Sequence, residues 1–152
     1  NNLIMNPESE YLISKAISGP FAKHLSISIV EAKAGHAVLK MPICEIHKES
    51  SGRVSYGAIV ALADTTIGIG ARTVMGKGEE SATLELQIIH LEQTSTSHLI
   101  STSIIRREDN VLIAGTVTVS DEYGNEIAIG QGTFAVFQAN QSPTHTKTSA
   151  PG

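Results

Sequence analysis

Eighteen consecutive residues carry only one charge, and they constrain the fold more than any other part of the sequence. Residues 54–71 are apolar, small or uncharged except for Asp64. Alanine, leucine and isoleucine dominate without strand-like alternation, which predicts a helix from near Ser55 to near Met75 and Gly76. Because apolar residues fall on every side of this helix, we expect the rest of the protein to wrap it. A carboxylate in its middle is costly to bury unless it is paired, protonated or used in a reaction.

The same stretch reaches the length of a membrane-spanning helix. Asp64, two threonines and three glycines lower its hydropathy, and no cluster of Lys and Arg flanks either end. The remaining chain has the alternating pattern of a soluble sheet protein. The sequence therefore predicts a helix buried in protein and no contact with a membrane.

Composition excludes several classes of function. The 152 residues fit one domain, and a net charge of −4 gives no electrostatic footprint for nucleic acid. A single cysteine, Cys44, excludes an intramolecular disulfide and fits a reducing compartment. Residues 1–6 do not have the form of a signal peptide, so we expect a cytoplasmic protein. The six histidines lack ligand spacing, and no metal or other cofactor is expected.

Shorter patterns on either side of the long helix predict the other elements. Residues 7–18 have helical spacing, and Gly19 and Pro20 form a stop signal. Residues 25–41 alternate with period two around a turn, which predicts a hairpin, and a polar loop follows at residues 42–53. Four further strands are expected at residues 83–90, 99–107, 111–120 and 126–137.

These elements predict an α+β domain in which an antiparallel sheet of about six strands wraps around the central helix. In the strand at residues 83–90, simple alternation places Thr83 with Glu85 and Gln87, on the face opposite to Leu86. One sheet covers only one side of a helix that is apolar all round. A second copy of the protein is the economical cover for the other side, so the sequence predicts a homodimer.

Several segments resemble the hotdog-fold acyl-CoA thioesterases of the phenylacetate-degradation (PaaI-like) type. They are Gly-Arg-Val-Ser-Tyr-Gly-Ala-Ile-Val-Ala-Leu-Ala-Asp at residues 52–64, the strand at residues 81–91, and the Asp-Glu-Tyr-Gly-Asn turn with the hairpin strand that follows it. The resemblance implies one hotdog domain in residues 1–137, followed by a polar tail at residues 138–152 whose composition predicts disorder. It also implies an acyl-CoA substrate and a homodimer or a dimer of dimers.

The resemblance assigns candidate catalytic roles. Asp64 takes the position of the catalytic carboxylate, a nucleophile or general base toward the thioester. Tyr56 and Gly57 take the positions of the two glycines of a His-Gly-Gly motif, in which a backbone N–H points at the thioester oxygen. Ser55 stands where the family has the His, and Glu49 stands where it has an Asn or Gln that positions water or substrate.

Further candidates follow from the same resemblance. Thr83 falls near a family Ser or Thr that helps the attacking water, so it is also a candidate catalytic residue. His47, Ser55 and Gly68 are the candidate substrate-binding residues, and His47 lies on the loop that leads into the helix.

Helix geometry by itself implies a shared site. Tyr56 and Asp64 are separated by eight residues of one helix, which is about 12 Å at ~1.5 Å per residue. The N–H groups and partial positive charge of a helix N-terminus can stabilise an oxyanion, but Asp64 of the same helix is too far away to attack a carbonyl group bound there. Two antiparallel central helices in a dimer would bring Asp64 of one chain to the Tyr56 amide of the other.

Other interpretations stay open. Asp64 is also consistent with a structural carboxylate that accepts hydrogen bonds from Thr or backbone groups. Ser55 has the character of an N-cap, and Tyr56 either fills space or narrows an acyl channel. Glu49 is also consistent with a solvated loop residue. The whole domain could bind acyl-CoA as a sensor or scaffold without hydrolysing it.

Overall fold

The computed structural model describes residues 7–140, apart from the side chains of residues 7–9 and 12. The elements are α1 (Pro7–Ile17), α2 (Pro20–His24), β1 (Ser28–Lys33), β2 (His36–Pro42), the 3-10 helix η1 (Glu45–His47), α3 (Tyr56–Arg72), β3 (Glu79–His90), β4 (His98–Arg107), β5 (Leu112–Ser120) and β6 (Glu126–Gln138). The predicted order of helix, hairpin, long helix and four strands is confirmed. α1 ends at Ile17, just before the predicted stop signal at Gly19 and Pro20. Pro20 also begins α2, because proline is favoured in a first helical turn.

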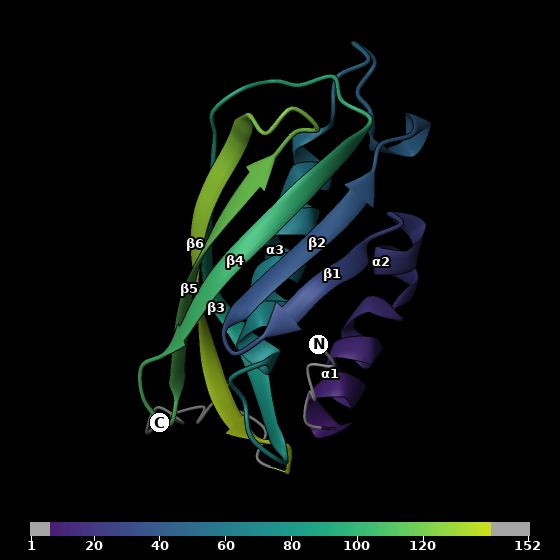
Figure 1. Ribbon diagram of the computed structural model, residues 1–152. Coiled ribbons are helices and arrows are strands. Elements are labelled where there is room, and N and C mark those ends of the chain that lie inside the picture. Colours follow the sequence, from purple (N-terminus) through teal and green to yellow (C-terminus); the bar gives the residue numbers. More distant parts are fainter. Residues whose placement is uncertain (1–6, 141–152) are drawn as a thin grey trace, which may run out of the picture.

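All six strands form one antiparallel sheet in the order β1-β2-β4-β5-β6-β3. The sheet curves around α3, which lies along one of its faces (Figure 1). This confirms the predicted α+β class, with a six-stranded sheet around a long helix. β3 follows α3 in the chain but lies at the edge of the sheet, where it pairs only with β6.

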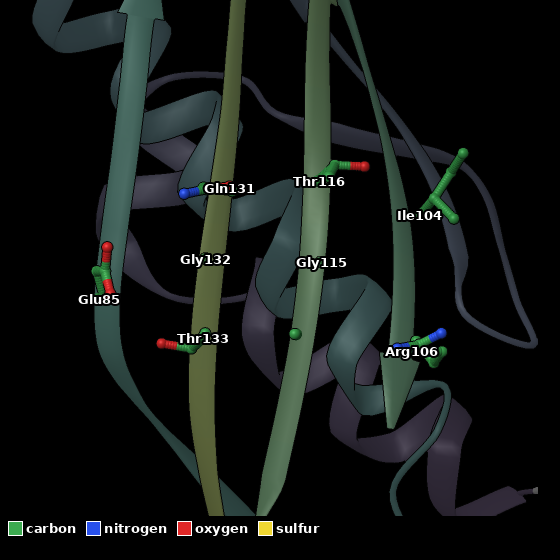
Figure 2. A pocket seen from close by; sticks show the side chains of 9 residues that line it. Glu85, Ile104, Arg106, Gly115, Thr116, Gln131, Gly132 and Thr133 are labelled. Atoms are coloured by element: carbon green, nitrogen blue, oxygen red, sulfur yellow. The ribbon is translucent and has the colours of Figure 1, made fainter. Parts of the chain in front are cut away.

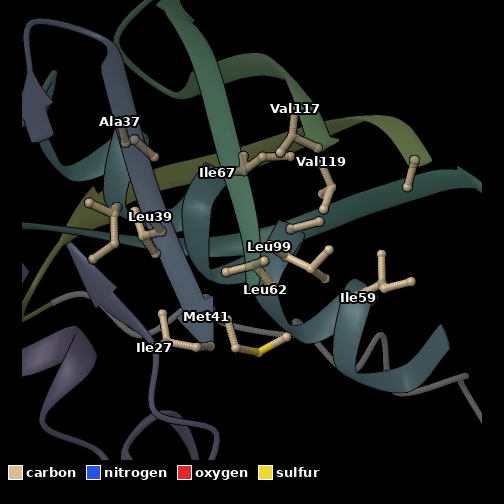
Figure 3. Packing of buried hydrophobic residues seen from close by; sticks show 14 of the residues in the cluster. Ile27, Ala37, Leu39, Met41, Ile59, Leu62, Ile67, Leu99, Val117 and Val119 are labelled. Carbon is tan, nitrogen blue, oxygen red and sulfur yellow. The ribbon is translucent and has the colours of Figure 1, made fainter. Parts of the chain in front are cut away.

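Buried side chains hold α3 against the inner face of the sheet (Figure 3). Leu62 of α3, Leu39 of β2 and Leu99 of β4 are all 0% exposed, and burying each such side chain contributes about 1.5–3 kcal/mol. At Gly70 a side-chain carbon would lie only 2.6 Å from Cγ1 of Ile105, so the absence of a side chain lets the helix approach β4 closely. This close packing fixes the position of α3 over the sheet.

The sheet covers only one side of α3. Ile59 and Ile67 are buried, whereas Tyr56 is 39% exposed and Asp64 is also exposed. The prediction that one sheet covers only one side of the helix is therefore confirmed, because a single sheet layer contacts a single helix face. We call the remaining exposed or half-buried stripe the open face of α3; it consists of Tyr56, Gly57, Val60, Ala61, Asp64, Thr65 and Gly68.

α3 ends at Arg72, earlier than the predicted Met75 and Gly76. The hydroxyl of Thr73 donates to the Gly70 carbonyl at 2.6 Å and accepts the Gly35 amide at 2.7 Å. Gly35 belongs to the turn between β1 and β2, so this hydrogen bond joins the end of the helix to the hairpin.

β6 is the last element of the described residues. β6 ends at Gln138, just beyond its predicted end, and the Ala139 amide donates to the Gly78 carbonyl at 2.8 Å. Most of the predicted tail, residues 141–152, lies outside the described residues. Within residues 7–140, no helix is long and apolar enough to cross a membrane.

Candidate active site

Asp64 lies on the wall of a cavity of about 230 Å³ between α1, α3, β3 and β6. Its other polar lining groups are Thr65 and Arg72 of α3 together with Ser81 and Thr83 of β3. Gly68 also lines it, where the lack of a side chain leaves room beside the helix, and the rest of the wall is Ala16 and Phe134. The structure thus brings three predicted site residues, Asp64, Gly68 and Thr83, to one cavity.

The carboxylate of Asp64 has no hydrogen-bond or ion-pair partner among the described residues. The hydroxyls of Thr65 and Thr66 both donate to helix carbonyls one turn earlier, those of Ala61 and Leu62, at 2.7 Å. The interpretation of Asp64 as a structural acceptor for such groups therefore fails within this chain. Desolvation in the cavity disfavours the charged form and raises the pKa of Asp64 above its ordinary value.

Thr83 reaches this cavity because of a β-bulge. Thr83 pairs with Phe134 and Glu85 pairs with the adjacent Thr133, so Leu84 is an extra residue in β3. Phe134 is 3% exposed and faces the core, and its partner Thr83 faces the same side. Simple alternation, which placed Thr83 with Glu85, is wrong here because the bulge changes the face on which the strand presents its side chains.

The N-terminus of α3 offers one unused backbone donor. Ser55 is the N-cap, as predicted, and its hydroxyl accepts the Gly57 amide at 3.2 Å. The amides of Ala58 and Ile59 both donate to the Ser55 carbonyl. Within the part of the chain that the structure describes, the Tyr56 amide has no acceptor, so it is the N–H that remains free for a ligand.

The Tyr56 side chain belongs to a cluster at the same end of the helix. Its ring stacks on His90 of β3, with ring centroids 4.1 Å apart. Its hydroxyl accepts a hydrogen bond from Nε2 of Gln93 at 3.3 Å, and Arg53 donates to the Gln93 side-chain oxygen. These contacts fix the ring beside the helix N-terminus, away from the Asp64 cavity.

His47 is buried on the loop before α3. It is 0% exposed; Nδ1 accepts the Cys44 amide at 3.1 Å, and Nε2 lies 2.7 Å from the Leu25 carbonyl, to which it donates. The substrate-binding role predicted for His47 does not fit this environment, because both ring nitrogens are used inside the protein. The sequence placed it correctly on the loop before α3 but gave no signal of its burial.

Glu49 is exposed on a tight turn before α3. Its amide donates to the Arg53 carbonyl at 2.8 Å, and its carbonyl accepts the Gly52 amide at 2.9 Å. It is not among the residues that line the Asp64 cavity. Within one chain, the structure therefore does not bring Glu49 to the other candidate catalytic groups.

Arg72 and Ser81 are cavity residues that the sequence analysis did not single out. Arg72 lies two helical turns after Asp64, where its charge resembles an ordinary cation at a helix C-terminus. The signal that could have found it is its i+8 spacing from Asp64, which keeps both side chains close to one helix face.

A larger hollow, of about 440 Å³, lies on the opposite face of the sheet (Figure 2). Glu85, Arg106, Thr116 and Gln131 point into it, away from α3. None of the predicted site residues lines this hollow, so we place the candidate chemistry at Asp64. No group of three His, Cys, Asp or Glu side chains within the described residues could hold a metal ion.

Comparisons with known proteins agree with this architecture. No family model matches the chain, and no curated protein matches it. Among solved structures, a thioesterase from Haemophilus influenzae superposes with a TM-score of 0.80 at 16% identity, over 95% of this chain and 97% of the other. A thioesterase family protein from Silicibacter pomeroyi gives 0.79 at 18% identity, over 86% of this chain and 98% of the other.

The PaaI protein of Escherichia coli, from the phenylacetic acid degradation operon, is a further structural neighbour. It superposes with a TM-score of 0.75 at 17% identity, over 86% of this chain and 94% of the other. At such low identities the likeness shows the fold. The predicted resemblance is thereby confirmed at that level: the chain has the hotdog fold of the PaaI-like thioesterases.

Proposed function

We propose that the protein hydrolyses the thioester of an acyl-CoA or acyl-carrier substrate at Asp64. The observation that carries this proposal is the carboxylate of Asp64, which has no partner within residues 7–140 and lies on the wall of a cavity that also contains hydroxyl groups. An ionisable group held in this way, partly desolvated and without a structural partner, is typical of a catalytic acid or base.

Two routes are consistent with this arrangement. In one, an Asp64 oxygen attacks the thioester carbonyl, the C–S bond breaks to release the thiolate, and water hydrolyses the resulting anhydride. In the other, Asp64 removes a proton from water as the water oxygen attacks the carbonyl carbon, and the C–S bond then breaks to release the thiolate. In both, the hydroxyl of Thr83 is placed on the cavity wall where it can orient the water.

The oxyanion that forms during either attack needs a donor. The free amide of Tyr56, at the positive end of the α3 dipole, supplies one. Gly57 was predicted as a donor together with Tyr56, but its amide is already bound to Ser55. We therefore assign the oxyanion contact to Tyr56 alone and a supporting, helix-capping role to Ser55.

A second copy of the chain completes the site in this proposal. Tyr56 and Asp64 lie at positions 1 and 9 of α3, about 12 Å apart along the axis at ~1.5 Å per residue. Residues 7–140 leave both the open face of α3 and the edge strand β3 uncovered. Two antiparallel α3 helices packed by their open faces would place Asp64 of one chain beside Tyr56 of the other, which makes a homodimer the smallest active unit.

Replacement of Tyr56 by proline tests the donor directly. Proline removes the amide hydrogen, is favoured in the first helical turn, and suits the extended backbone of Ser55 before it. Tyr56→Pro should reduce kcat by about 100-fold or more, the usual effect of losing one oxyanion donor. Tyr56→Ala is the matched control, because it loses the same ring but keeps the amide; an equal loss in both variants would contradict the assignment.

Mixing two inactive variants tests the shared site. In a dimer of one Tyr56→Pro chain and one Asp64→Asn chain, one of the two shared sites retains both the amide and the carboxylate. Activity should therefore appear when the two purified variants are unfolded together and refolded, and not when either is treated alone. Failure to regain activity, with heterodimers demonstrated by mass spectrometry, would show that the two groups do not act across chains.

A non-catalytic acyl-CoA binder is the second candidate. The observation that favours it is Ser55, which stands where the related motif has a His and is already used as a helix cap. Hydrolysis assays across short, medium, long and aromatic acyl-CoA esters decide between the two. A thermal shift with free CoA, without turnover of any ester, would support the binder and overturn the hydrolase.

A further inference from the structure

A second hollow of about 310 Å³ adjoins the Asp64 cavity. Arg72, Ser81 and Ala16 line both spaces, so the Arg72 side chain borders each of them. The other residues around the second hollow are Lys15, Met75, Glu79 and Glu80. A ligand that reacts at Asp64 can therefore extend along α3 as far as Arg72.

Arg72 holds its charge in this space without a carboxylate partner among the described residues. Its Nη1 donates to the Gly68 carbonyl at 3.1 Å. By contrast, the two arginines at the end of β4 each have a carboxylate partner: Arg106 lies 2.7 Å from Glu108, and Arg107 lies 2.6 Å from Glu79. The guanidinium is partly buried, and this loss of hydration lowers the pKa of Arg72. Holding a desolvated cation is costly unless an anion meets it there.

The other charges around the second hollow leave it positive. Both oxygens of Glu79 are occupied, one by Nη1 of Arg107 and the Gly76 amide and the other by Nη2 of Arg107. Lys15 and Glu80 are exposed and oppose each other in sign. The charge that remains around the second hollow is therefore that of Arg72.

The distance between the Arg72 guanidinium and Asp64 limits how far the anion of a ligand can lie from its reacting carbonyl group. Arg72 reaches back one turn to the Gly68 carbonyl, and Gly68 is four residues after Asp64, or about 6 Å along the helix. An anion bound to Arg72 thus lies only a few bonds from a carbonyl that reacts at Asp64. The phosphates of CoA are separated from its thioester by the whole pantetheine arm, which is much longer, so the anion belongs to the acyl group.

We propose that Arg72 binds a carboxylate at the far end of the substrate's acyl chain, so that the preferred substrates are thioesters of short dicarboxylic acids, of the length of succinyl or glutaryl. This inference rests on the proposed thioesterase function of Asp64. Guanidinium and carboxylate match in geometry, since two parallel N–H groups can donate to the two oxygens. The hydroxyl of Ser81, which lines both spaces, is available as a further donor.

Paired esters of equal chain length test the proposal: succinyl-CoA against butyryl-CoA, and glutaryl-CoA against valeryl-CoA. The wild-type protein should show the higher kcat/KM for the dicarboxylic ester of each pair. Arg72→Gln should lower the ratio of kcat/KM, dicarboxylic over neutral, by about tenfold or more, and Arg72→Lys should restore part of it. Arg106→Gln, on the opposite sheet face, is the control and should leave the ratio unchanged. An unchanged ratio in Arg72→Gln would overturn the proposal while leaving the hydrolase intact.

A binding measurement separates this proposal from the hydrolase itself. If no ester is hydrolysed, glutarate should still raise the melting temperature of the wild-type protein and not that of Arg72→Gln, which would support the anion site alone. No effect of glutarate or succinate on the wild type would overturn the site. Stabilisation by free CoA that is lost in Arg72→Gln, without any effect of glutarate, would assign Arg72 to the carrier phosphates and overturn the acyl carboxylate.

Discussion

Thr83 of β3 and Asp64 of α3 line one cavity because Leu84 is an extra residue in β3. Without the bulge, Thr83 would share the outward face of Glu85, on the other side of the sheet from the helix. Leu84 itself is 63% exposed. The bulge therefore turns the Thr83 hydroxyl toward the cavity and leaves Leu84 exposed.

Thr83→Val removes this hydroxyl and keeps both the shape of the side chain and its preference for a strand. We expect kcat to fall about 10- to 100-fold, because the attacking water loses one of the groups that orient it. Thr83→Ser should retain most of the activity. Thr116→Val, on the outer sheet face, is the matched control; an equal loss there would show that the effect is general to the sheet.

Asp64 should make the stability of the protein depend on pH in an unusual direction. Its pKa is raised by desolvation, so the folded state binds its proton more tightly than the unfolded state does. Its contribution to stability is complete below the unfolded pKa and is lost as the pH rises through the folded pKa. Asp64→Asn should therefore be more stable than the wild type at neutral pH, with a difference that vanishes in acid. Denaturant unfolding at several pH values measures this.

The same shift should appear in the kinetics. Asp64 works as nucleophile or base only when ionised, so kcat/KM should rise with pH along an acid limb centred above the ordinary range of an aspartate. An acid limb at the ordinary value would show that Asp64 is not desolvated in the active species. Removing Thr83 should lower the plateau without moving this limb.

The sequence predicted α3 and the strands because their patterns are long and regular. Asp64 could be singled out because it is the one charged residue in the long apolar pattern of residues 54–71. The bulge at Leu84 was not predictable, since an extra residue leaves the alternation of apolar and polar residues on each side of it unchanged. Arg72 was missed because a cation at a helix C-terminus has an ordinary explanation, and only the three-dimensional structure shows that it lines the Asp64 cavity without a carboxylate partner among the described residues.

Glu79 should stabilise the fold by joining the loop after α3 to the end of β4. Its carboxylate accepts two hydrogen bonds from Arg107, at 2.6 and 2.7 Å, and one from the Gly76 amide at 2.6 Å. Glu79→Gln should lower the free energy of unfolding by about 1–3 kcal/mol, the usual range for hydrogen bonds to a charged group. Glu80→Gln, next in the chain and exposed, is the control.

The hydrogen bonds from Arg107 lower the pKa of Glu79, and this gives a second measurement. Its contribution to stability is present above the unfolded pKa of the glutamate and is lost as the pH falls through the lower, folded pKa. The difference between the wild type and Glu79→Gln should accordingly shrink in acid. A difference that does not depend on pH would mean that the ion pair is not formed in solution.

His47→Leu tests whether this histidine supports the fold or the substrate. Replacement leaves the Leu25 carbonyl and the Cys44 amide without the ring that now binds both. Because His47 is 0% exposed and its hydrogen bond to the Leu25 carbonyl is buried, the loss should lower the free energy of unfolding by about 1–3 kcal/mol. His47→Asn, which keeps one short polar group, should lose less. Below the melting temperature of each variant, KM for any hydrolysed ester should stay at the wild-type value, since the ring does not reach the Asp64 cavity. A raised KM with unchanged stability would restore His47 as a substrate-binding residue and would place the acyl or carrier group on the loop before α3.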